Sequence, residues 1–108
     1  MPVKKCYKLV RDQVPGVLRG GGHKVVTRTI YGKELLKALR TRFGEELVEY
    51  DAAVDDEKAT ASLVDMAELI RAMAKQRGMS ESKFQQASEA RVAQQDAFEL
   101  GIFVVTID

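Results

Sequence analysis

The chain has 108 residues and is 45% hydrophobic, which suffices for one small domain and leaves no room for a second. Its formal net charge is +1, so it lacks the basic surplus that a dedicated nucleic-acid binder needs for phosphate-backbone affinity. No apolar run approaches the ~20 residues of a membrane span, and residues 1–10 lack the apolar stretch of a signal peptide. We therefore expect a single cytoplasmic domain over residues 1–108, with no membrane and no nucleic acid among its partners.

The chain has modest means of building a core of its own. Trp is absent and aromatic residues make up only 6% of the sequence, so aliphatic side chains and four methionines must provide most of the packing. The single cysteine, Cys6, cannot close a disulfide within the chain, and no cysteine–histidine cluster has the spacing of a zinc site. We expect a protein of a reducing compartment that gains apolar packing as a homodimer or higher homo-oligomer.

A short helix is expected within residues 7–22. Pro15 suits the first turn of a helix, because its φ angle is already helical and its missing N–H has no partner there to lose. Asp12 is placed to cap the start of this helix, although it serves equally well as a site residue. The three glycines at positions 20–22 would end the helix.

A strand is predicted for residues 24–30, because this segment is rich in β-branched side chains. Residues 102–107, at the other end of the chain, are its expected partner. Two short strands are only marginally stable by themselves, so we expect the pair to pack on helices.

A long amphipathic helix is predicted over residues 32–54. Its apolar side chains recur at spacings of three and four: Leu36, Leu39, Phe43, Leu47, Tyr50 and Val54. Gly44 lies inside this helix at a cost of roughly 1 kcal/mol relative to Ala. That glycine indicates either the close approach of another backbone or ligand, or a tolerated surface position.

Two further helices complete the predicted protomer. The second long helix covers about residues 57–77, and either Asp55 or Asp56 caps its start. Its core face carries Leu63, Met66, Ile70 and Met73. The third helix begins after Ser80 and continues towards residue 97, and its polarity places it on the outside or in an interface.

Charge is divided unevenly along the sequence. From Lys4 to Arg42 the charged residues are basic apart from Asp12 and Glu34, whereas seven acidic residues and no basic ones follow between positions 45 and 57. This division suits a site that combines metal-holding carboxylates with phosphate-holding cations. It suits equally well two solvated faces of opposite charge.

Carboxylates recur at helical spacing on both long helices. Glu46 lies three residues before Glu49, and Asp65 lies three residues before Glu68, so each pair occupies neighbouring faces of its helix. A short connection makes the two helices antiparallel neighbours, which brings the pairs opposite each other. Magnesium prefers oxygen ligands and completes its shell with water and phosphate. The spacing suits a magnesium site, and it also suits an ordinary solvated acidic face.

The segment Tyr7–Asp12, which reads YKLVRD and precedes Val14 and Pro15, resembles the opening of one branch of the all-α nucleotide pyrophosphohydrolases. This superfamily includes MazG and phosphoribosyl-ATP pyrophosphohydrolase. Further matching segments follow in the family's order along nearly the whole chain: Thr27-Arg28, Glu45–Glu49, Asp65–Ile70, Gly78–Ser80, Phe98-Glu99 and Gly101–Phe103. The resemblance implies a mostly α, three-helix protomer with a small two-stranded β element, which dimerises into a helical bundle.

The resemblance also implies an activity and a set of site residues. Members of the superfamily hydrolyse a nucleoside triphosphate between its α and β phosphates, and non-standard nucleotides are candidate substrates. Magnesium, or manganese in its place, would be held by Glu46, Glu49, Asp65 and Glu68. The expected catalytic residues are Glu45 and Glu46, with Glu45 either completing the metal shell or accepting the proton of the attacking water. The expected substrate-binding residues are Lys8, Arg11, Asp12 and Arg91.

Two segments depart from the family's pattern. Ser62 stands where the resemblance implies a metal-binding glutamate, so one charge and one good donor oxygen are missing. Gln94–Ala97 replaces a basic stretch and two glycines near the end of the third helix. These departures keep two alternatives open. One is a degenerate relative that binds nucleotide or a protein partner without turnover, and the other is an oligomeric module whose acidic face binds a basic partner.

Overall fold

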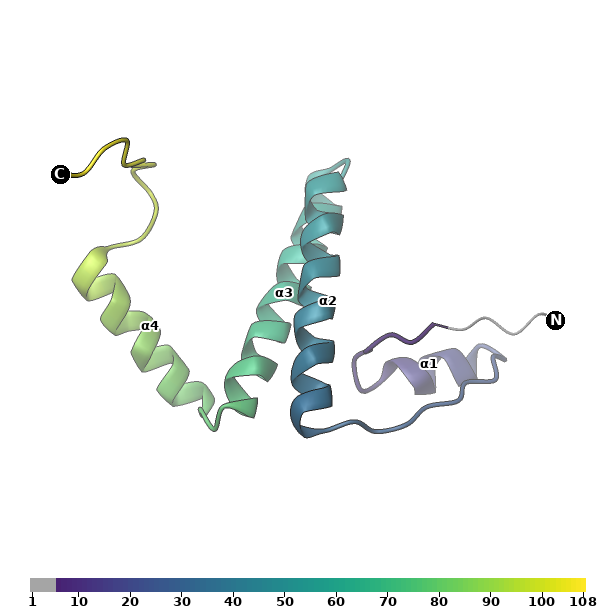
Figure 1. Ribbon diagram of the computed structural model, residues 1–108. Helices are drawn as coiled ribbons and strands as arrows, with labels where there is room; N and C mark the ends of the chain where they lie inside the picture. The colour runs from purple at the N-terminus through teal and green to yellow at the C-terminus, as the bar shows by residue number, and fades with distance from the viewer. Residues whose placement is uncertain (1–5) are drawn as a thin grey trace.

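The structure is a computed structural model, which describes residues 6–108. Within this range the chain forms four helices joined and flanked by irregular segments. The helices are α1 (Val14–Gly20), α2 (Gly32–Ala52), α3 (Asp56–Gln76) and α4 (Glu81–Gln95). Figure 1 shows α2 and α3 side by side, with α4 leaning away from α3 and α1 lying beyond α2. The mostly helical class predicted from the sequence is confirmed, with the short α1 added to three longer helices.

The helices α2 and α3 are antiparallel because a connection of only three residues joins them. Asp55 starts α3, since its carboxylate accepts a hydrogen bond from the backbone N–H of Lys58 at 2.8 Å. The predicted cap is confirmed, with Asp55 rather than Asp56 in that role. Ser80 caps α4 in the same way, because its hydroxyl accepts a hydrogen bond from the backbone N–H of Lys83 at 3.2 Å.

The start of α1 differs from the prediction. Pro15 lies in the first turn, as expected, but Gln13 rather than Asp12 occupies the cap position and no side chain caps the helix. Gln13 has helical φ and ψ angles of −86° and −11°, whereas a capping side chain needs an extended backbone. The chain enters α1 through a turn in which the N–H of Val14 donates to the carbonyl of Arg11 at 3.0 Å. The predicted Asp12 cap is therefore wrong.

The predicted β element is wrong as well, because residues 6–108 contain no strand. Residues 24–30 and 102–107 are irregular, and most of their side chains are exposed. Val26, for example, is fully exposed at 100%. A two-stranded pair is stable only when another element covers its apolar face, and the exposure of these segments shows that none of the four described helices does so.

The apolar core is small and lies between α2 and α3. Its buried apolar side chains are Leu39, Met66 and Ala74. The predicted stripe is covered only in its first half, since Leu47 and Tyr50 are exposed and Val54 lies beyond the end of α2 at Ala52. Gly44 has open space where a Cβ would stand, so no described part of the chain approaches it closely.

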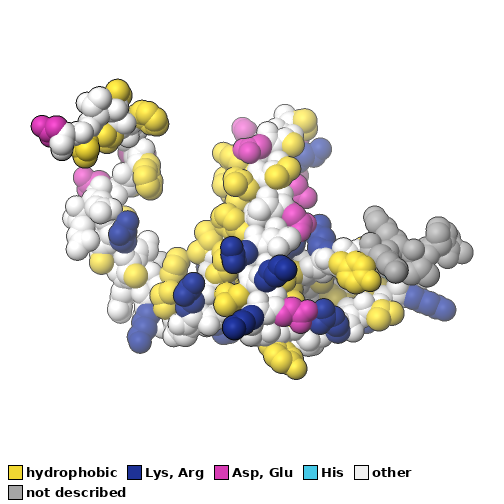
Figure 2. All heavy atoms as spheres, viewed as in Figure 1, with side chains coloured by type: hydrophobic (Ala, Val, Ile, Leu, Met, Phe, Trp, Pro, Cys, Tyr) yellow, Lys and Arg dark blue, Asp and Glu magenta, His cyan; other side chains and the backbone are white. Residues whose placement is uncertain are grey.

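The arrangement of the helices leaves more surface exposed to solvent than is usual for a folded monomer of this size. The solvent-accessible area is 10065 Å², whereas a folded monomer of 12.0 kDa exposes about 6,000 Å². The radius of gyration is 18.1 Å, against about 13 Å for a typical domain of this length. Hydrophobic side chains gather on the side of α3 that faces α4 (Figure 2). Among the helices of residues 6–108, none is long and apolar enough to cross a membrane.

Candidate functional site

An open cleft of about 340 Å³ lies between the C-terminal half of α2 and the N-terminal half of α3. Its lining consists of Glu46, Glu49, Ala52, Ala53, Lys58, Ala61, Ser62 and Asp65. The alanines leave room between the helices, and the remaining side chains are polar or charged. Three of the four predicted metal ligands, Glu46, Glu49 and Asp65, therefore share one cleft.

Glu46 forms a partly buried ion pair at this site. Its side chain is only 2% exposed, and its Oε1 accepts a hydrogen bond from Nη2 of Arg42 at 2.6 Å. Within the described residues, Glu46 Oε2 and Arg42 Nη1 are buried without a hydrogen-bond partner. A buried polar atom without a partner typically costs about 1–3 kcal/mol, so a ligand that supplies a positive charge to Oε2 would relieve that cost. Because Arg42 precedes Glu46 by one turn of the same helix, the pair forms with little rearrangement.

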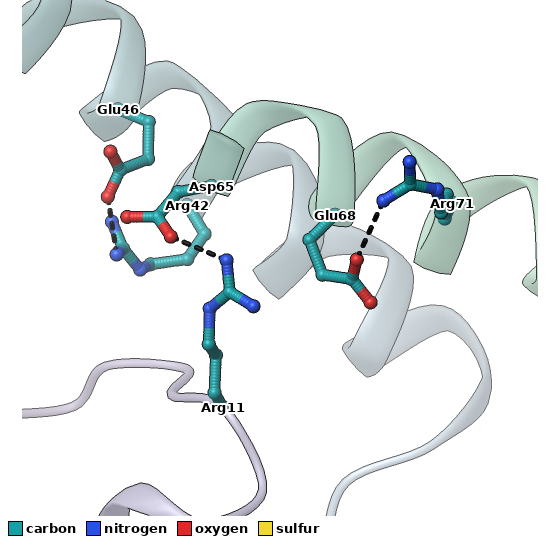
Figure 3. Close-up of polar contacts among 6 residues, drawn as sticks. All are labelled: Arg11, Arg42, Glu46, Asp65, Glu68 and Arg71. Carbon is teal, nitrogen blue, oxygen red and sulfur yellow. Dashed lines mark hydrogen bonds and ion pairs between the residues drawn. The ribbon is translucent and has the colours of Figure 1, made fainter. Parts of the chain in front are cut away.

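Asp65 is held by a cation from a distant part of the sequence. Arg11, which precedes α1, donates from Nη2 to Asp65 Oδ1 at 2.6 Å. Figure 3 shows the Arg11 side chain reaching from the N-terminal part of the chain towards the carboxylates of the helical pair. The hydrogen bond to Asp65 raises the pKa of Arg11, desolvation opposes the rise, and the charges of Asp65, Glu68 and Glu46 add to it. Arg11, a predicted substrate-binding residue, is therefore hydrogen-bonded to Asp65, a predicted metal ligand.

The remaining predicted site residues lie outside the cleft. Glu68 accepts a hydrogen bond from Nη1 of Arg71 at 3.0 Å on the surface of α3. Glu45 is exposed on α2, with its carboxylate 3.8 Å from Nη1 of Arg42. Three predicted substrate-binding residues are exposed and do not line the cleft: Lys8, Asp12 and Arg91. Arg91 lies on α4, whose one neighbour among the described helices is α3.

The carboxylates of the cleft have the chemistry of a magnesium site. Carboxylate oxygens are the ligands that magnesium prefers, and the buried Glu46 Oε2 has no hydrogen-bond partner in the part of the chain that the structure describes. In the range 6–108, no three Asp, Glu, His or Cys side chains converge closely enough to hold a metal ion. Arg42 and Arg11 instead hold Glu46 and Asp65 in separate ion pairs. The two guanidinium groups partly neutralise the charges of these two carboxylates.

Two cations of the site were missed by the sequence reasoning. Arg42 has the four-residue spacing to Glu46 that predicts an ion pair along a helix. Lys58 lies four residues before Ser62 and seven before Asp65, so these three residues share one face of α3 and line the cleft together. Helical spacing was therefore a usable signal for both. Ser62, which was expected at the site, is buried within the cleft lining.

Comparison of the chain with protein-family models, with curated proteins and with solved structures finds no match. The resemblance to the all-α nucleotide pyrophosphohydrolases stays a prediction from sequence motifs.

Proposed function

We propose that the protein is a magnesium-dependent nucleotide pyrophosphohydrolase, which converts a nucleoside triphosphate to a monophosphate and pyrophosphate. The observation that carries the proposal is the cleft itself. It is lined by three carboxylates from two helices, one of them with a buried oxygen that has no hydrogen-bond partner within residues 6–108, and it lies beside Arg11 and Lys58. Hard anionic donors next to exposed cations suit a ligand made of a divalent cation and phosphate groups.

The carboxylates have distinct proposed roles. Glu46, Glu49 and Asp65 hold magnesium, or manganese in its place, and Glu68 joins them if it leaves Arg71. A metal ion bound there would neutralise phosphate oxygens and lower the pKa of the attacking water. Glu45 is exposed beside Glu46, and it either completes the metal shell or accepts the proton of that water.

The cations bind the phosphate groups. Arg11 offers a planar fork that can donate two hydrogen bonds to one phosphate, whereas Lys58 and Lys8 act as point charges. Lys58 lines the cleft, and Lys8 lies three residues before Arg11 on the same segment. Lys8, Asp12 and Arg91 do not line the cleft in a single chain, so their proposed contact with substrate needs a second copy or a movement of their segments.

A homodimer accompanies this proposal. The solvent-accessible area of 10065 Å² exceeds the expectation for a monomer of this mass by about two-thirds. Large apolar side chains of α2 and α3 are among the exposed ones: Leu47, Val48, Tyr50, Leu63, Val64 and Ile70. A second copy that covers these faces would complete a bundle of four long helices, as helical proteins with short connections commonly do.

Pyrophosphate release tests the proposed reaction. The parent protein is incubated with magnesium and a panel of standard and non-standard triphosphates, and Glu46→Gln and Glu89→Gln are assayed beside it. Glu89 is exposed on α4, so its substitution controls for the loss of one carboxylate elsewhere. We expect release by the parent and by Glu89→Gln, and none by Glu46→Gln. Equal behaviour of the parent and Glu46→Gln, or no release from any triphosphate, would contradict the proposal.

Ser62 favours one alternative, a degenerate relative that binds nucleotide without turnover. The side chain is buried in the cleft at the position where the resemblance implies a glutamate ligand. Ser62→Glu separates the two functions. If the substitution creates magnesium binding and pyrophosphate release that the parent lacks, the alternative is correct; if the parent is already active, it fails.

A further inference from the structure

The segment of residues 6–20, called the N-terminal segment below, is attached to the helical pair by one polar contact. Within residues 6–108, the Arg11–Asp65 hydrogen bond is the sole side-chain hydrogen bond between residues more than six positions apart. The backbone hydrogen bonds outside the helices are also local. Helix α1 packs against none of the other three helices. Asp65 is therefore the polar anchor of this segment.

This anchor is exposed enough to exchange its partner. The side chains of Arg11 and Asp65 are 53% and 36% exposed, and such pairs shift a conformational equilibrium by up to about fivefold. A divalent cation in the cleft carries twice the charge of a guanidinium and would be shared by Glu46 and Glu49. Asp65 would then gain more from the cation than from Arg11, so the weak anchor would be lost.

We propose that Arg11 is an exchangeable counter-cation, which rests on Asp65 while no divalent cation is bound and transfers to the ligand's phosphate groups once the cation takes Asp65. This inference rests on the proposed function, because it uses the same cleft as a metal and phosphate site. It adds an order of events: the cation binds first and releases the N-terminal segment, and the phosphate ligand then recaptures the segment through Arg11.

The exchange makes the two ligands cooperative. Without the cation, Asp65 competes with phosphate for the Arg11 guanidinium, whereas with the cation that competition ends. Cation and phosphate therefore raise each other's affinity by the same factor, as linkage requires.

Cys6 makes the exchange measurable. It is exposed, it is the chain's single cysteine, and it lies five residues before Arg11, so a nitroxide label there reports the mobility of the N-terminal segment by electron paramagnetic resonance. We expect Mg²⁺ alone to raise the mobile fraction by up to about fivefold. Inorganic pyrophosphate added after Mg²⁺ should immobilise the label again, whereas pyrophosphate without Mg²⁺ should have little effect.

Three variants and a parallel calorimetric titration of Mg²⁺ complete the test. The label should be mobile from the start in Arg11→Gln and in Asp65→Asn, and Mg²⁺ should change neither. Arg28→Gln is the matched control, because Arg28 makes an exposed pair with Glu34 at the same distance of 2.6 Å. It should behave as the parent does.

The outcomes separate this inference from the proposed function. If calorimetry shows that Mg²⁺ binds while the label stays unchanged, the counter-cation exchange is wrong and the metal site stands. If the label is as immobile in Asp65→Asn as in the parent, the anchor is wrong. If no Mg²⁺ binds to the parent, the proposed metal site fails and the exchange fails with it.

Discussion

Glu46 lies one helical turn after Arg42, and the two side chains form a partly buried ion pair in which each keeps one buried polar atom without a hydrogen-bond partner among residues 6–108. A pair of this kind gains from mutual attraction and loses hydration, so its net contribution to stability is small. Removal of only one partner lowers the stability strongly, because the remaining charge then stays buried without an opposite charge beside it.

The first prediction concerns this pair. Arg42→Met should lower the free energy of unfolding by about 3 kcal/mol, because it strands the Glu46 carboxylate, whereas the double substitution Arg42→Met with Glu46→Leu should recover most of that loss. Chemical denaturation of both variants measures the effect. Mg²⁺ should restore part of the stability of Arg42→Met and none of that of the double variant. Equal stability of the parent and Arg42→Met would contradict the buried pair.

The second prediction concerns the start of α3. Asp55→Ala should lower the free energy of unfolding by about 1 kcal/mol, because the N–H of Lys58 loses its acceptor. Asp56→Ala is the matched control, since the neighbouring residue has the same charge and no capping role; its effect should be smaller. Urea denaturation compares the two variants, and a larger effect at Asp56 would show that the cap is assigned to the wrong residue.

The third prediction concerns pH. The hydrogen bonds that Arg28 donates to Glu34, at 2.6 and 3.2 Å, lower the pKa of Glu34 below its usual value of 4.5. The stabilisation from this pair is therefore present above pH 4.5 and is lost as the pH falls through the lowered pKa.

An NMR titration of the Glu34 side-chain carboxyl carbon measures that pKa directly. The midpoint should lie below 4.5 in the parent and return towards 4.5 in Arg28→Gln. Arg11→Gln, which breaks an exposed pair elsewhere, should leave the midpoint unchanged. An unaltered midpoint in Arg28→Gln would mean that the pair does not persist in solution.

The fourth prediction concerns assembly. We expect sedimentation to show a homodimer at micromolar concentration, because the exposed apolar faces of α2 and α3 exceed what a monomer of this size usually presents. Leu47→Lys should shift the protein towards monomer, since a charge there opposes burial of the α2 face. Val26→Lys should not, because Val26 belongs to an irregular segment outside the helices. A folded, monomeric parent would overturn the homodimer.

The helices were predictable because their signals are local. Apolar spacing located α2 and α3, and the caps at Asp55 and Ser80 are short-range contacts that a residue makes with its own helix. The strands were not predictable in the same way. β-branched composition around Val26 is a local preference, whereas a strand also needs a distant partner and a covering layer, and neither forms here.

In the candidate site, too, the local relationships were predictable from the sequence and the long-range contact was not. Glu46, Glu49 and Asp65 share the cleft because a short connection makes α2 and α3 antiparallel, which the sequence indicates. The contact between Arg11 and Asp65 spans 54 positions, so no spacing rule specifies it. The two residues were expected in separate roles, on phosphate and on metal. Their ion pair became visible only in three dimensions.

Lys58 takes part in both the N-terminal cap of α3 and the lining of the cleft. Its backbone N–H completes the cap on Asp55, and its side chain lines the cleft. The first turn of α3 therefore sets the position of a candidate phosphate-binding cation, and any fraying of that turn carries the cation away with it. A substitution at Asp55 would be felt in ligand affinity as well as in stability, although Asp55 itself lies outside the cleft lining.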